Sequence, residues 1–118
     1  MPKTRKELLD EISQYFTIKS TDKEKVYNLY IADQVVGTLL LVVKGDKINH
    51  GYMFEFLAIK YGFTAFLEAN FNYDGKDHTM YLVSGGEDDL KKKAKQFYDY
   101  CLLNRASSSY LHDYKESK

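Results

Sequence analysis

The amino-acid sequence predicts an α+β fold, in which two hairpins form an antiparallel sheet of about four strands in the order α-ββ-α-ββ-α. Segments with apolar residues at helical spacing alternate along the chain with segments in which apolar and polar residues alternate one by one. An Asp-Gly dipeptide, typical of a tight hairpin turn, separates two of the alternating segments. The 118 residues, of which 44% are hydrophobic, suffice for a single compact domain over residues 1–118.

The first helix is predicted over residues 5–16. Thr4 and Glu7 have the spacing of a capping box, in which each side chain accepts a hydrogen bond from the backbone of the other residue. Apolar residues then recur on one side of the helix, at Leu8, Leu9, Ile12, Tyr15 and Phe16. The polar stretch 19–24 is expected to be a loop.

A first hairpin is predicted from Lys25 onward. Residues 27–31 alternate as a strand does, and Asp33-Gln34 can turn the chain. Residues 35–43 are continuously apolar and rich in β-branched side chains, which predicts a central strand buried on both faces. Gly37 inside this strand indicates a bulge or a close contact.

Residues 49–61 are open to two interpretations. As a helix, the segment has Asn49 as N-cap, Gly62 at the C′ position and a buried stripe, whose members are Met53, Phe54, Leu57, Ala58 and Tyr61. As a strand, it converts the fold into a five-stranded antiparallel meander flanked by the N- and C-terminal helices. The length of the segment and the Gly62 stop favour the helix.

A second hairpin and a last helix complete the chain. Residues 63–71 alternate, Asp74-Gly75 turns the chain with Lys76-Asp77 completing the loop, and residues 78–83 return. The last helix is predicted from Glu87 to residues 104–106, with helices packed on one face of the sheet. Its buried line comprises Leu90, Ala94, Phe97 and Cys101. Residues 107–118 are expected to form a mobile tail or a short final turn.

Composition excludes several classes of protein. Lys+Arg and Asp+Glu number 17 each, and the two signs are interleaved in every segment, which argues against a nucleic-acid-binding stripe. The single cysteine excludes an internal disulfide, and no apolar run approaches a membrane span, so we expect a cytoplasmic protein without membrane contact. Abundant Lys, Tyr and Asn without Trp are compatible with a phage or mobile-element source.

The sequence holds no motif that indicates catalysis, a cofactor or a metal site. The run of charged residues on the last helix predicts three i,i+4 ion pairs, Glu87–Lys91, Asp88–Lys92 and Asp89–Lys93. The three histidines stand far apart, without metal-ligand spacing, and Cys101 lies on a buried helix line. We therefore expect a protein that is not an enzyme, with no cofactor and no metal.

Tyrosine is the most informative residue type, with 11 in the chain. On the last helix, Tyr98 and Tyr100 flank the buried line at about 80° on either side, and Leu103 points to the far side. Tyr110 and Tyr114 in the tail either cover these residues or join them in a surface for a protein partner. The predicted partner-binding residues, called here the C-terminal tyrosine surface, are Tyr98, Tyr100, Leu103, Tyr110 and Tyr114.

These observations predict a small non-enzymatic protein-binding module. An inhibitor, an immunity-type protein or an accessory regulatory protein fits its size and its aromatic surplus. The alternatives are a homodimeric structural protein, in which the same apolar residues pair across a two-fold axis, and a weak nucleic-acid-binding protein.

Overall fold

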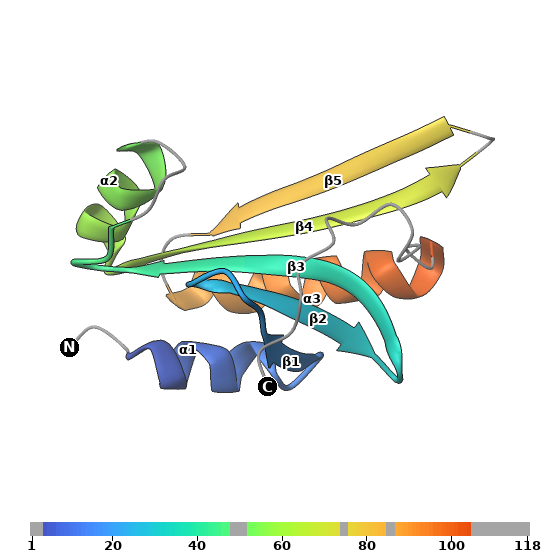
Figure 1. The fold of residues 1–118 in the computed structure, drawn as a ribbon, viewed down its shortest axis with the longest axis horizontal. Coiled ribbons are helices and arrows are strands. Elements are labelled where there is room, and N and C mark those ends of the chain that lie inside the picture. Colours follow the sequence, from blue (N-terminus) through green and yellow to red (C-terminus); the bar gives the residue numbers. More distant parts are fainter. Residues whose placement is uncertain (1–3, 48–51, 74–75, 85–86, 105–118) are drawn as a thin grey trace.

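The structure, a computed structural model, describes residues 4–47, 52–73, 76–84 and 87–104. It confirms the predicted α+β class, with element order α-βββ-α-ββ-α (Figure 1). The helices are α1 (Arg5–Ile12), α2 (Tyr52–Tyr61) and α3 (Glu87–Asn104). The strands are β1 (Thr17–Ser20), β2 (Val26–Ile31), β3 (Gln34–Val43), β4 (Phe63–Tyr73) and β5 (Lys76–Ser84).

The five strands form one antiparallel meander in the order β1-β2-β3-β4-β5. The sheet thus has one strand more than the four that we predicted. Residues 52–61 are helical, as the favoured interpretation has it. The five-stranded alternative therefore predicts the right number of strands but the wrong fifth strand. The additional strand is β1, whereas the alternative assigned it to residues 49–61.

Strand β1 begins directly after the predicted helix, and its residues 19 and 20 fall in the predicted loop. Helix α1 ends at Ile12 instead of residue 16, and Ser13 closes it by donating its hydroxyl to the carbonyl of Asp10 (2.8 Å). The chain then turns so that Phe16 enters the core, and Ile18 pairs with Leu29 of β2. A four-residue strand with one apolar side chain carries no periodic signal. Pairing with β2 and the packing of Ile18 against the main core stabilise it.

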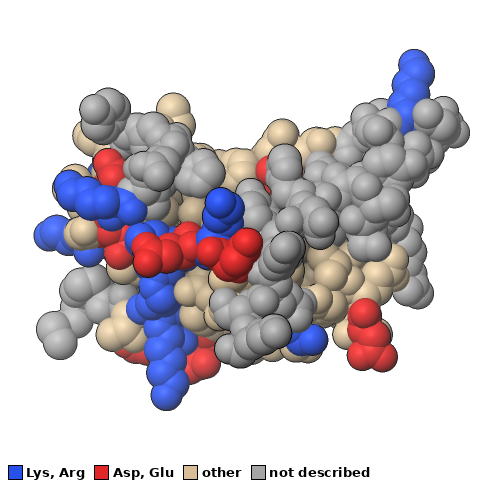
Figure 2. Space-filling model, viewed as in Figure 1, with Lys and Arg blue, Asp and Glu red and all other residues tan. Residues whose placement is uncertain are grey.

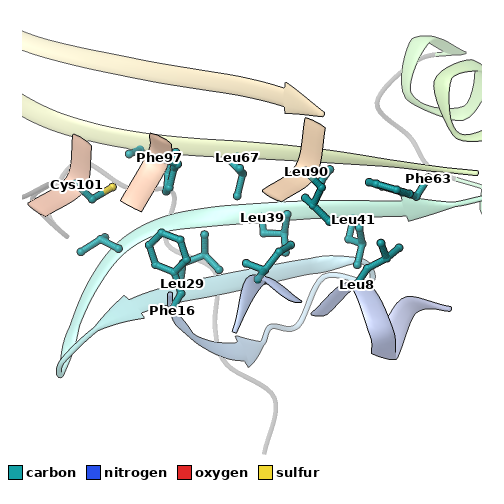
Figure 3. Packing of buried hydrophobic residues seen from close by; sticks show 14 residues of the cluster. Leu8, Phe16, Leu29, Leu39, Leu41, Phe63, Leu67, Leu90, Phe97 and Cys101 are labelled. Carbon is teal, nitrogen blue, oxygen red and sulfur yellow. The ribbon is translucent and has the colours of Figure 1, made fainter. Parts of the chain in front are cut away.

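The main core lies between the sheet and the two terminal helices (Figure 3). Alternate residues of the central strands, such as Leu39 and Leu41 of β3 and Leu67 of β4, point to this side. Helix α3 contributes the predicted line, since Leu90, Ala94, Phe97 and Cys101 are all buried. The predicted central strand is also confirmed, because β3 is the middle strand and is buried on both faces.

Helix α2 packs on the opposite face of the sheet, so the prediction that the helices share one face is wrong. Ala58 of α2 lies in a second, smaller cluster with Val26, Leu40 and Val42, against which Phe54 and Phe66 pack. The continuous apolar run of β3 explains this arrangement, because its residues 40 and 42 need a cover on this side. Figure 1 shows α2 at one end of the sheet, away from α1 and α3.

The second hairpin follows the prediction with one difference. Lys76 and Asp77 belong to β5 instead of the loop, and Tyr73 pairs with Lys76. The predicted tail, residues 107–118, and the predicted N-cap Asn49 lie outside the described residues. The radius of gyration of 13.7 Å agrees with about 13.5 Å for a compact domain of this length.

Candidate functional site

Helix α2 exposes apolar side chains that neither core accommodates. Met53, Phe56 and Ile59 are 69%, 62% and 64% exposed. They recur every three residues and so lie on one side of the helix. We call these three residues the α2 stripe. Large hydrophobic side chains that are exposed together, rather than singly, are typical of surfaces that bind proteins, membranes or ligands.

Hydrogen bonds among the described residues close the C-terminal end of α2 and attach the helix to the neighbouring strands. Gly62 follows the helix with a φ of 92°, which favours glycine, and its N–H donates to the carbonyl of Ala58 (2.8 Å). Thr64 of β4 donates its hydroxyl to the carbonyl of Phe54 (2.9 Å). The N–H of Lys44, just after β3, donates to the carbonyl of Gly62 (3.1 Å). The α2 stripe is therefore presented by a fixed helix.

The predicted buried face of α2 is only partly correct. Ala58 is buried and Phe54 and Leu57 are half-buried, but Met53 and Tyr61 are exposed. Almost every residue of this helix is apolar, so the periodicity does not select a face. The signal that we missed is this all-round hydrophobicity, since a helix packed on one face of a sheet cannot bury every side.

An aromatic row connects α2 with the edge of the sheet. The rings of Phe54 and Phe66 lie 5.3 Å apart, and those of Phe66 and Tyr81 lie 5.3 Å apart. Tyr81 of the edge strand β5 is 55% exposed. The row thus runs from the base of α2 across β4 to an accessible tyrosine on the same face.

The exposed charged residues on α2 and on the described part of the β3–α2 connection are all lysines, namely Lys44, Lys47 and Lys60. The acidic residues there are less exposed. Asp46 forms an ion pair with Arg5 and accepts a hydrogen bond from the N–H of Val43 (2.9 Å), and Glu55 is half-buried. Figure 2 shows acidic and basic side chains close together on the viewed face, and both kinds are present at the end that carries α2.

The structure brings the described part of the C-terminal tyrosine surface into contact with the core. The ring of Tyr98 lies 5.5 Å from that of Tyr15 and 5.6 Å from that of Phe16. Tyr98 and Tyr100 are both half-buried and pack against the main core. The side chain of Leu103, and Tyr110 and Tyr114 as a whole, lie outside the part of the chain that the structure describes. Packing against the core therefore gives Tyr98 and Tyr100 a structural role, and their predicted role in binding a protein stays a prediction.

Cys101 has the environment of a structural thiol. It is buried, and burial raises the pKa of its thiol to about 12. A nucleophilic cysteine needs the opposite shift, because the thiolate is the reactive form.

Of the three predicted ion pairs on α3, Asp89–Lys93 is present, with 3.3 Å between the carboxylate oxygen and the ammonium nitrogen. The other two involve Glu87 and Asp88, whose side chains are not described. Lys93 also donates to the carbonyl of Val83 (2.5 Å). Within the described residues, no three His, Cys, Asp or Glu side chains are placed to hold a metal ion. The side chains of all three histidines lie outside the part of the chain that the structure describes.

A groove of about 430 Å³ lies between α1 and the edge strand β1. Its walls carry hydroxyl groups and one carboxylate, and its lining residues are Leu9, Asp10, Ser13, Phe16, Thr17, Ile18, Ser20 and Tyr27. The hydroxyl of Tyr27 accepts a hydrogen bond from the guanidinium of Arg5 (3.3 Å).

Comparisons with protein-family models, with curated proteins and with solved structures find no match to this chain. Among the described residues, no helix is both long and apolar enough to cross a membrane.

Proposed function

We propose that this protein is a small non-enzymatic protein-binding module, acting as an inhibitor, an immunity-type protein or an accessory regulator, with α2 as its recognition element. The observation that carries the proposal is the exposure of Met53, Phe56 and Ile59 on a helix that is otherwise anchored to the sheet. Protein-binding helices present such anchors three or four residues apart to a groove of the partner.

The size of the surface supports this role. The α2 stripe exposes on the order of 400 Å² of apolar area, a patch of the size that is often functional on a monomeric protein. Phe56 lies at its centre, and a central aromatic side chain commonly contributes most of the binding energy of an interface. The proposal moves the recognition surface from the C-terminal tyrosine surface to α2. We place the protein in the cytoplasm, where a lone thiol such as Cys101 stays reduced.

Affinity capture from an extract of the source organism tests the proposal. The bait is the full-length protein, either wild type, Phe56→Ser or Tyr110→Ala/Tyr114→Ala. We expect Phe56→Ser to lose a partner that the wild type and the double variant both retain. Loss of the partner by the double variant alone would assign the binding site to the C-terminal tyrosine surface. Equal recovery of every specific partner by all three baits would refute both assignments.

A further inference from the structure

Resting on the proposed function, we infer that the partner of the α2 stripe is a protein with an apolar groove whose rim carries carboxylates. Two properties of the protein point to this partner, namely the area of the stripe and the charge of the exposed lysines on α2 and on the connection that leads into it. The proposed function leaves the chemistry of the partner open.

The area of the stripe favours a groove over a flat surface. Two copies of this chain that paired their stripes face to face would bury on the order of 800 Å² in total, about half of a standard stable interface. A groove also covers the sides of the helix. Tyr61, which is 47% exposed, and the alkyl part of Lys60, whose ammonium lies 5.2 Å from the Tyr61 ring centre, then add to the contact.

The charges favour an acidic rim. Lys60 directly follows Ile59 of the stripe, Lys44 is hydrogen-bonded through its N–H to the end of α2, and Lys47 lies on the connection that leads into α2. Asp46 is neutralised by Arg5. A partner with carboxylates around its groove gains favourable contacts with these lysines, whereas a second copy would bring its own Lys44, Lys47 and Lys60 to the interface.

The inference can be tested without knowing the partner, with two small amphiphiles as probes. Decanoate combines an apolar tail with a carboxylate, and decyltrimethylammonium has the same tail with a cationic head. Each is titrated below its micelle-forming concentration into the isotope-labelled full-length protein, and amide shifts are followed by NMR. We expect decanoate to bind at the amides of residues 53–61 and at least about fivefold more tightly than the cation. Equal affinities, or shifts confined to other elements, would overturn the inference.

A matched pair of triple variants isolates the lysines. Lys44→Gln/Lys47→Gln/Lys60→Gln is expected to weaken decanoate binding roughly tenfold. The control Lys6→Gln/Lys23→Gln/Lys91→Gln removes the same charge from exposed positions on α1, the β1–β2 loop and α3. We expect this control to change the affinity for decanoate less than about twofold. Equal weakening by both variants would show a general charge effect and contradict the inference. Unfolding midpoints of all variants establish that they are folded.

Two further measurements exclude other occupants. A dimer in sedimentation velocity that Phe56→Ser dissociates would assign the stripe to a second copy instead. Co-sedimentation with phosphatidylcholine–phosphatidylglycerol vesicles that Phe56→Ser abolishes would assign it to a lipid surface. A monomeric protein that does not co-sediment with the vesicles supports the inference. In affinity capture, a partner lost by Phe56→Ser but kept by the lysine variant would overturn the acidic rim and leave the proposed function standing.

Discussion

At the scale of single residues, Gly37 determines how closely α3 approaches the sheet. It lies in β3 beside a bulge, where Leu29 pairs with Gly37 and the next residue, Tyr30, pairs with Val35. A Cβ atom at this position would lie 2.6 Å from the carbonyl oxygen of Glu68 and 2.8 Å from the ring of Phe97. The glycine that the sequence indicated as a bulge or close contact is thus both.

We expect Gly37→Ala to lower the free energy of unfolding by about 2 kcal/mol or more, because β4 or Phe97 must move to admit the methyl group. Gly45→Ala is the matched control. Gly45 has a φ of 97° but no atom within 4 Å of an added Cβ, so its replacement costs only backbone strain, about 1 kcal/mol. Urea denaturation measures both values. A smaller loss for Gly37→Ala than for Gly45→Ala would contradict the close packing.

Cys101 predicts a dependence of stability on alkaline pH. The folded protein holds the thiol proton up to a pKa of about 12, whereas the ordinary value is 9.0. Between these two values the folded state binds more protons than the unfolded state, so the free energy of unfolding should fall as pH rises from about 9 to 12. Below pH 9 this contribution is constant.

The measurement compares denaturation midpoints of wild type and Cys101→Ala between pH 8 and the alkaline limit of folding. The alanine variant is expected to be less stable at pH 8 and to lose less stability on alkalinisation than the wild type. Iodoacetamide should label Cys101 only in denaturant. Rapid labelling of the native protein would show that the thiol is accessible.

At the scale of elements, Arg5 links α1 to the end of β3. Its guanidinium donates to the carbonyl of Leu41 (2.8 Å) and forms an ion pair with Asp46, which also accepts from the N–H of Val43. This side chain therefore joins the first turn of α1 to the turn that begins the connection to α2. The ion pair is partly buried, so losing one partner leaves the other poorly compensated.

Arg5→Ala is accordingly expected to destabilise the fold by about 1–3 kcal/mol. Lys6→Ala, the exposed neighbour on the same helix, should change stability by less than about 0.5 kcal/mol. Thermal and urea unfolding of the two variants provide the comparison. Similarly small losses of unfolding free energy in both variants would mean that Arg5 contributes no more to stability than a surface charge does.

Elements with strong local signals were predictable from the sequence, and those that depend on distant partners were not. The capping box of α1 is formed, with Thr4 accepting from the N–H of Glu7 at 3.2 Å. The boundaries of β4 and α3 also follow from periodicity and the residues that flank them. Strand β1 and the Arg5–Asp46 ion pair escaped prediction because each joins segments whose proximity only the folded sheet creates.

At the scale of the whole molecule, the two faces of the sheet have different roles. One face carries α1, α3 and the main core. Tyr98 and Tyr100, which the sequence suggested as binding residues, pack against this core. The other face carries α2 on a smaller cluster, and the outer side of α2 remains exposed. The all-round hydrophobicity of α2 indicates that one apolar side stays exposed, but it does not tell which residues form that side.

The central claim is that the α2 stripe binds a protein partner, and isothermal titration of the captured partner tests it most directly. The titrations compare wild type, Phe56→Ser and Leu102→Ser, the last replacing a 41% exposed leucine on α3. Because Phe56 is 62% exposed, its replacement should leave the unfolding midpoint almost unchanged. We predict that Phe56→Ser raises Kd at least about tenfold, as expected for a central aromatic anchor, and that Leu102→Ser leaves Kd unchanged. An unchanged Kd for a folded Phe56→Ser variant would contradict the claim.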